Sequence, residues 1–165
     1  MNKKSLRYML AAALFAALIT VFTAYVLHIP MPGTGGYVHF GDALVFLAAC
    51  LLPGPWAAPA GALGAGLADL LTAPAYCIPT VLIKACVALC FSAKTKKVLC
   101  PRNALALLPA GIFTLGGYYI AEGILFGWEA ALPHLPFNLI QWLGSAAVFA
   151  ALGYAMDRAE LKGRI

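Results

Sequence analysis

Several polar residues lie within long apolar stretches of this sequence. They are Asp69, Lys84, Tyr118, Glu122, Asn138 and Gln141. Charged and amide side chains are costly to bury in hydrocarbon, so each of them indicates a partner, a cavity or a ligand. Asn138 and Gln141 are three residues apart and would share one face of a helix. The chemistry that these residues favour is hydrogen bonding and charge pairing with a small polar molecule.

The depth of these residues can be estimated from the turns that flank the apolar stretches. At a rise of roughly 1.5 Å per residue, Asp69 lies about 9 Å below the turn near Ala75, and Lys84 lies about 14 Å below it. A lysine side chain spans that difference, so the sequence predicts an ion pair between Asp69 and Lys84. Whether this pair binds a ligand or braces two helices stays open. The other polar residues fall at similar depths, so the set can converge on one outward-facing pocket.

The apolar stretches that carry these residues are predicted to be membrane-spanning helices. Hydrophobic residues make up 63% of the chain and charged residues only 10%, whereas charged residues make up about a quarter of a soluble domain. At about 20 residues per crossing, the chain has room for about six spans and for no soluble domain. We therefore predict an all-α integral membrane protein with six transmembrane helices, in which residues 1–165 form a single membrane domain.

Turn residues and apolar runs place the spans. The predicted ranges are Leu6–Leu27, Asp42–Leu52, Trp56–Leu71, Cys77–Phe91, Ala104–Phe126 and Phe137–Met156. Asp42 directly follows Gly41 and is expected to cap the second helix. The second, third and fourth ranges are short, which favours helices that are partly buried within a bundle.

Basic residues give the orientation. All Lys and Arg residues except Lys84 lie in three clusters between or outside the spans: Lys3, Lys4 and Arg7; Lys94, Lys96, Lys97 and Arg102; and Arg158, Lys162 and Arg164. By the positive-inside rule all three clusters, and therefore both termini, are cytoplasmic. We expect a multi-pass protein of a bacterial plasma membrane. The net charge of +5 is explained by this orientation and by anionic lipid, not by nucleic acid.

Motifs of several other protein classes are missing. The sequence contains no GxxxxGK[ST], HExxH or GxSxG motif, so we expect neither an enzyme nor a cofactor. The cysteines form no CxxC pair, and His28, His39 and His134 lie in loops without i, i+4 spacing to a carboxylate, which argues against a metal site. A capture subunit that depends on another protein for energy remains. The alternative is a self-sufficient small secondary carrier or channel for a small polar metabolite.

Small residues recur at helical spacing in two of the predicted spans, and such faces let helices approach closely. In the third span they are Ala57, Gly61 and Ala65, for which we predict internal packing. In the first span they are Ala12, Ala13, Ala16 and Ala17. These four alanines are suited either to internal packing or to contact with a partner membrane protein.

Five distinctive segments are spread through the chain: GYVHFGDA (36–43), GALGAGLADL (61–70), PTVLIKA (79–85), GGYYIAE (116–122) and PFNLIQW (136–142). They resemble segments of the substrate-binding S components of energy-coupling factor (ECF) vitamin transporters. The resemblance implies a high-affinity capture subunit of an ECF-type ABC transporter that imports a water-soluble B-group vitamin or precursor. Its partners would be a transmembrane coupling protein and two ATPase subunits. Pyridoxine-like, hydroxymethylpyrimidine-like and riboflavin-like ligands all stay open.

The same resemblance implies functional residues. The ligand-binding candidates are Tyr37, His39, Tyr118, Glu122, Asn138 and Gln141, with Lys84 and Asp69 behind them. Glu122, Asn138 and Gln141 would hydrogen-bond a polar heterocycle, while Tyr37 and Tyr118 would stack on it. The face formed by Ala12, Ala13, Ala16 and Ala17 resembles the surface that S components present to their coupling protein.

Overall fold

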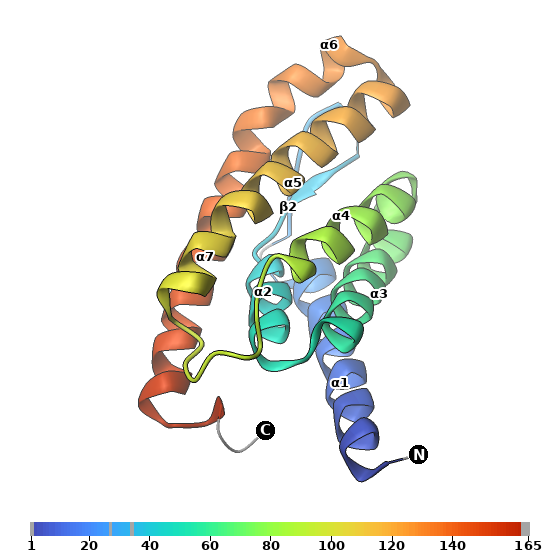
Figure 1. Ribbon diagram of the computed structural model, residues 1–165. Helices are drawn as coiled ribbons and strands as arrows, with labels where there is room; N and C mark the ends of the chain where they lie inside the picture. Colours follow the sequence, from blue (N-terminus) through green and yellow to red (C-terminus); the bar gives the residue numbers. More distant parts are fainter. Residues whose placement is uncertain (1, 27, 34, 163–165) are drawn as a thin grey trace.

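The computed structural model describes residues 2–26, 28–33 and 35–162, which form a bundle of helices (Figure 1). The main helices are α1 (Lys3–Tyr25), α2 (Asp42–Leu51), α3 (Gly54–Thr72), α4 (Cys77–Leu89), α5 (Pro101–Phe126) and α7 (Leu135–Arg158). Each of these helices corresponds to one predicted span, and the predicted all-α class is confirmed. Leu27, the predicted end of the first span, and Arg164 of the third basic cluster lie outside the described residues.

Among the described residues, three stretches are long and apolar enough to cross a membrane. They are α1, α5 and the stretch Trp128–Arg158, which includes α7, whereas α2 and the stretch Pro74–Leu89 are shorter. The protein is therefore an all-helical membrane protein, while the number of six crossings stays a prediction. The start of α1, the end of α7 and the α4–α5 loop lie at one end of the bundle, which we call the basic end (Figure 1).

The opposite end, which we call the hairpin end, carries a β-hairpin that the sequence did not predict. Strands β1 (Ile29–Pro30) and β2 (Tyr37–Val38) are antiparallel, with Ile29 opposite Val38. Gly33 has φ +95° in the connecting turn, a conformation that glycine adopts without steric cost. The other connections at this end are η1 (Pro74–Tyr76), α6 (Trp128–Ala131) and η2 (Leu132–His134).

Helix α2 forms the centre of the bundle. All of its residues are buried, and it contacts α1, α3, α4 and α7. A helix that is apolar on every side is suited to such a position. At the end near the α4–α5 loop, Phe46 stacks on Phe91 with ring centroids 5.1 Å apart and meets Phe149 edge-on at 5.9 Å. The one charged residue of α2, Asp42, lies at its other end.

Small residues bring α1 and α3 into close contact. A Cβ atom on Gly64 would lie 2.7 Å from the Ala16 carbonyl oxygen and 2.8 Å from Ile19 Cβ, so no larger residue fits there without a shift. The Thr20 hydroxyl donates a hydrogen bond to the Gly64 carbonyl at 2.8 Å. Internal packing of the small residues of α3, as predicted, is confirmed because Ala57 and Ala65 are each 1% exposed.

The four alanines of α1 do not share one role. Ala12 is buried and Ala16 is half-buried, because their side of α1 packs within the bundle. Ala13 and Ala17 are exposed. Only the second pair is therefore free to meet a partner without unpacking the bundle.

The α4–α5 loop at the basic end is held by buried polar side chains. Asn103 is fully buried; its Oδ1 accepts from the Ser92 backbone N–H at 3.0 Å. Its Nδ2 donates to the carbonyl oxygens of Ser92 and Val98 at 3.2 and 3.1 Å. From α7, Asp157 accepts the backbone N–H groups of Val98 and Leu99 at 2.7 and 2.8 Å. These bonds give the loop a fixed shape.

We expect Asn103→Ala to lower the free energy of unfolding by about 1–3 kcal/mol, because buried backbone groups of the loop lose their partners. Reversible unfolding in mixed detergent micelles measures this change. Arg102→Ala is the matched control, since Arg102 is the exposed neighbour on the same helix and should change stability little. Equal stability of the two variants would show that Asn103 does not hold the loop.

Candidate ligand-binding site

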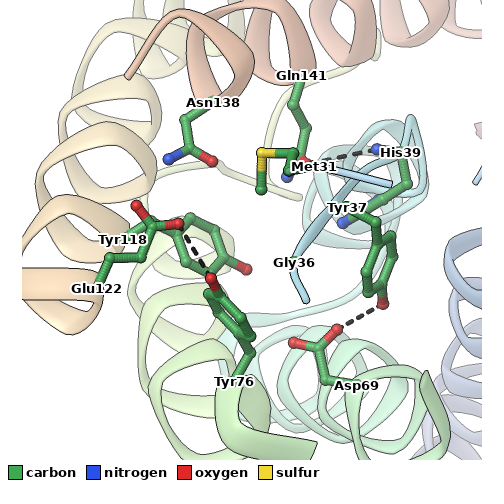
Figure 2. Close-up of a pocket in the computed structure, with 10 residues that line it drawn as sticks. All are labelled: Met31, Gly36, Tyr37, His39, Asp69, Tyr76, Tyr118, Glu122, Asn138 and Gln141. Atoms are coloured by element: carbon green, nitrogen blue, oxygen red, sulfur yellow. Dashed lines mark hydrogen bonds between the residues drawn. The ribbon is translucent and has the colours of Figure 1, made fainter. Parts of the chain in front are cut away.

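A polar cavity lies at the hairpin end of the bundle (Figure 2). The cavity is lined by the hairpin segment, by which we mean residues 28–33 and 35–41, and by α3, η1, α5 and α7. The lining residues are Met31, Gly36, Tyr37, His39, Asp69, Tyr76, Tyr118, Glu122, Asn138 and Gln141. Its volume is about 20 Å³, which has room for about one water molecule. The structure thus brings together all the predicted ligand-binding residues except Lys84, which lies outside the lining.

Glu122 and Asn138 form one wall of the cavity (Figure 2). Glu122 is fully buried, and its Oε1 accepts from the Tyr76 hydroxyl at 3.4 Å. Its Oε2 and the Nδ2 of Asn138 are buried without a hydrogen-bond partner among the described residues. This wall therefore offers an unused acceptor and an unused donor to a molecule in the cavity.

His134 connects this wall to the hairpin segment. Its Nε2 lies 3.0 Å from the Pro32 carbonyl oxygen. A carbonyl only accepts, so Nε2 carries a proton. Its Nδ1 lies 3.4 Å from Glu122 Oε1. His134 therefore lies between the Glu122 carboxyl group and the backbone of the hairpin segment.

Tyrosine hydroxyls line the opposite part of the cavity. The Tyr37 hydroxyl donates to Asp69 Oδ1 at 2.5 Å, and the Tyr118 hydroxyl shares a hydrogen bond with Thr80 Oγ1 at 2.9 Å. Burial and the Asp69 carboxylate raise the pKa of Tyr37, so its hydroxyl stays protonated and donates. The Tyr37 ring stacks on His28 with centroids 3.8 Å apart. One face of that ring is therefore already covered by the hairpin segment.

His39 is held as a neutral donor. The Gly41 backbone N–H donates to His39 Nδ1 at 3.1 Å, which places the ring proton on Nε2. Burial, opposed in part by the Asp42 carboxylate, lowers the pKa of His39 to about 4. The ring is therefore uncharged near neutral pH. Its backbone N–H donates to Gln141 Oε1 at 3.4 Å, which ties the hairpin segment to α7.

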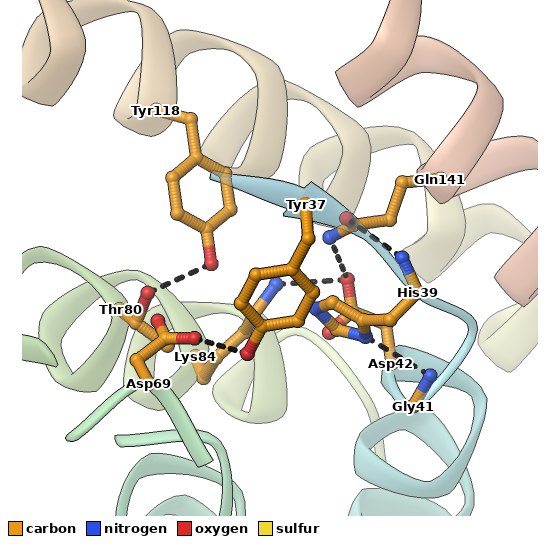
Figure 3. Close-up of polar contacts among 9 residues, drawn as sticks. All are labelled: Tyr37, His39, Gly41, Asp42, Asp69, Thr80, Lys84, Tyr118 and Gln141. Atoms are coloured by element: carbon orange, nitrogen blue, oxygen red, sulfur yellow. Dashed lines mark hydrogen bonds and ion pairs between the residues drawn. The ribbon is translucent and has the colours of Figure 1, made fainter. Parts of the chain in front are cut away.

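A buried ion pair lies beside the cavity (Figure 3). Lys84 Nζ is 2.8 Å from Asp42 Oδ2, and the two side chains are 0% and 1% exposed. Gln141 Nε2 donates to the same oxygen at 3.2 Å. Lys84 Nζ also lies 4.9 Å from the centroid of the Tyr118 ring, within the range of a cation–π contact. Lys84 thus positions lining residues instead of lining the cavity itself.

Two predictions about charged residues are wrong. Lys84 forms its ion pair with Asp42 and not with Asp69, because the central helix α2 brings Asp42 against α4. Asp69 accepts from Tyr37 instead. Asp42 does not cap α2: Gly41 is the N-cap residue, no side chain caps the helix, and the Asp42 carboxylate bonds to Lys84 and Gln141.

The sequence analysis did not identify three of the lining residues, Met31, Gly36 and Tyr76. It also did not identify Thr80, the hydrogen-bond partner of Tyr118. Tyr76, Thr80 and Lys84 are spaced by four and are all buried. That spacing places them on one side of a helix and could have revealed Tyr76. The positions of Met31 and Gly36 in the lining depend on the hairpin, which has no periodic signal in the sequence.

Comparisons with known proteins identify relatives of this chain. The family model for the S component of ECF-type riboflavin transporters matches residues 3–158, from the first residue of α1 to the last residue of α7. An uncharacterised protein from a gap 3′ region of Pyrococcus woesei is 29% identical over 143 residues, covering 85% of this chain and 95% of the relative. Its description assigns it no activity.

We expect Lys84→Met to lower the free energy of unfolding by about 3–5 kcal/mol, because it leaves the Asp42 carboxylate buried without its cation. Adding Asp42→Asn to the same chain should recover most of the loss, since the orphaned charge is then gone. Unfolding in mixed micelles measures both effects. Lys94→Met, at an exposed position, is the control. A Lys84→Met protein as stable as the wild type would contradict this account of the pair.

Proposed function

Since this chain belongs to the family of ECF-type riboflavin transporter S components, we propose that it captures a water-soluble vitamin or vitamin precursor in the polar cavity. One observation carries the proposal: Glu122 Oε2 and Asn138 Nδ2 are buried in the cavity wall, close to each other, and among the described residues neither atom has a hydrogen bond of ordinary geometry. A buried polar atom without a hydrogen bond costs about 1–3 kcal/mol. A ligand with a donor next to an acceptor would satisfy both atoms at once.

The lining favours a polar heterocycle that is neutral or positively charged. Asp69 and Glu122 supply carboxyl groups, and none of the lining residues that the structure describes is Lys or Arg. Such a site attracts neutral or protonated rings and repels phosphate esters. Pyridoxine-like, hydroxymethylpyrimidine-like and riboflavin-like molecules all have hydrogen-bonding ring edges that suit the unused atoms.

The closed cavity must open for a ligand to bind. Ligand pockets usually measure about 300–1,000 Å³, far more than the present volume. The hairpin segment closes the site: the Met31 side chain is 6% exposed, and its backbone N–H bonds to the Gly36 carbonyl at 2.8 Å. Gly36 packs so closely on Tyr76 that an added Cβ would lie 3.0 Å from the hydroxyl. Withdrawal of Met31 and Gly36 would enlarge the cavity.

The family also points to protein partners. We propose that the chain works with a transmembrane coupling protein and two ATPase subunits in a bacterial plasma membrane. The exposed pair Ala13 and Ala17 on α1 is the surface that we propose for the coupling protein. Small residues there let a partner helix approach closely.

We expect Glu122→Ala and Asn138→Ala each to weaken ligand binding at least tenfold, which is about 1.4 kcal/mol. A thermal-shift screen of the detergent-purified protein against B vitamins, their precursors and their phosphate esters first finds the ligand, because a ligand of the folded state raises the unfolding temperature. Calorimetry then gives the affinities. Glu129→Ala is the matched control, since Glu129 is exposed. Unchanged affinity in both cavity variants would remove this site.

We expect Ala13→Trp and Ala17→Trp to block co-purification with the coupling protein and ATPases, because a large side chain prevents close helix packing. Ligand binding should be unchanged. Ile112→Trp, at an exposed position on α5, is the control for added surface bulk. Intact co-purification of both alanine variants would rule out this face of α1.

A further inference from the structure

We propose that the basic end of the bundle holds the phosphate headgroup of an anionic phospholipid between the α4–α5 loop and the end of α7. A cavity of about 340 Å³ lies there, and its lining residues are Lys97, Leu99, Tyr154, Asp157 and Arg158. The cavity is separate from the polar cavity at the hairpin end, with which it shares no lining residue. The inference is independent of the proposed vitamin capture.

The site is built by contacts that fix its two sides relative to each other. Both carboxylate oxygens of Asp157 accept backbone N–H groups of the loop, from Val98 and Leu99. Lys162 Nζ, beyond the end of α7, donates to Thr95 Oγ1 at 3.0 Å. Buried Asn103 holds the same loop from α5. The loop that carries Lys97 is therefore attached to the helix that carries Arg158 before any ligand arrives.

The charge of the site suits a phosphate group. Lys97 and Arg158 are exposed and contribute two cations. The carboxylate of Asp157 is the opposing charge in the lining, but it is occupied by two backbone donors. The planar guanidinium of Arg158 can bind two phosphate oxygens at once, while a lysine acts as a point charge. Lys94 and Lys96, exposed in the same loop, add to the positive potential.

The apolar part of the lining selects a lipid over a soluble anion. Tyr154 is 60% exposed, one turn before the end of α7, and Leu99 is half-buried beside it. Tyrosine is enriched where a membrane helix meets the headgroup region. The stretch that includes α7 is also long and apolar enough to cross a membrane. A phosphate held by the two cations would therefore direct its glycerol and acyl chains along Tyr154 and Leu99.

The test compares thermal unfolding in detergent micelles that contain phosphatidylglycerol or phosphatidylcholine at the same mole fraction. Phosphatidylglycerol should raise the unfolding temperature of the wild type more, because a ligand of the folded state stabilises it. The double variant Lys97→Ala/Arg158→Ala should lose most of this difference and bind phosphatidylglycerol roughly tenfold or more weakly. Lys94→Ala/Lys96→Ala, which removes the same charge from outside the lining, should keep most of it.

Three results would overturn the proposal. The first is no difference between the two lipids in the wild type. The second is an equal loss in both double variants, which would show diffuse attraction instead of a site. The third is a rise in unfolding temperature with inorganic phosphate in phosphatidylcholine micelles that equals the rise with phosphatidylglycerol, which would show a soluble-anion site. Tyr154→Ser tests the apolar part: it should weaken binding of phosphatidylglycerol, and unchanged binding would contradict the lipid assignment.

Discussion

The ion pair between Asp42 and Lys84 governs the arrangement of the hairpin end. A single charge in the interior of a membrane protein is costly, and each of these residues removes the cost for the other. Their contact fixes the start of α2 against the middle of α4. Gln141 adds α7 to the same carboxylate, and the His39 backbone bonds to the other end of that amide. Three helices and the hairpin segment are thus positioned around one charge.

This arrangement divides the polar cavity into a satisfied side and an unsatisfied side. Beside the ion pair, Asp69, Tyr37 and Gln141 all have hydrogen-bond partners within the protein. Along the other wall, Glu122 and Asn138 each retain an unused polar atom. Asp69, Tyr37 and Gln141 already have partners, so the hydrogen bonds that a ligand newly gains are those at the wall of Glu122 and Asn138.

The sequence predicted which polar residues gather but not which ones pair. Helical rise gives depth along the membrane, and depth alone placed Asp69, Glu122, Asn138 and Gln141 in one layer. Pairing depends on the lateral order of the helices, which hydropathy does not contain, because a residue that faces lipid and one that faces another helix are equally apolar. The short second span predicted burial within the bundle but not which helices surround α2, and Lys84 was therefore assigned to the wrong carboxylate. The hairpin was not predicted because strands of two residues have no measurable period in the sequence.

The complete burial of α2 has a consequence for how the protein is made. Helix α2 has ten residues, too few to cross a membrane by itself, and its Asp42 carboxylate has no cation until Lys84 of α4 is in place. Of the helices that α2 contacts, α7 is the last to leave the ribosome, and it carries Gln141. The segment must wait, inserted with its neighbours but unpacked, while most of the chain is still being synthesised. The binding cavity, to which α7 contributes Asn138 and Gln141, is consequently completed only in the final step of assembly.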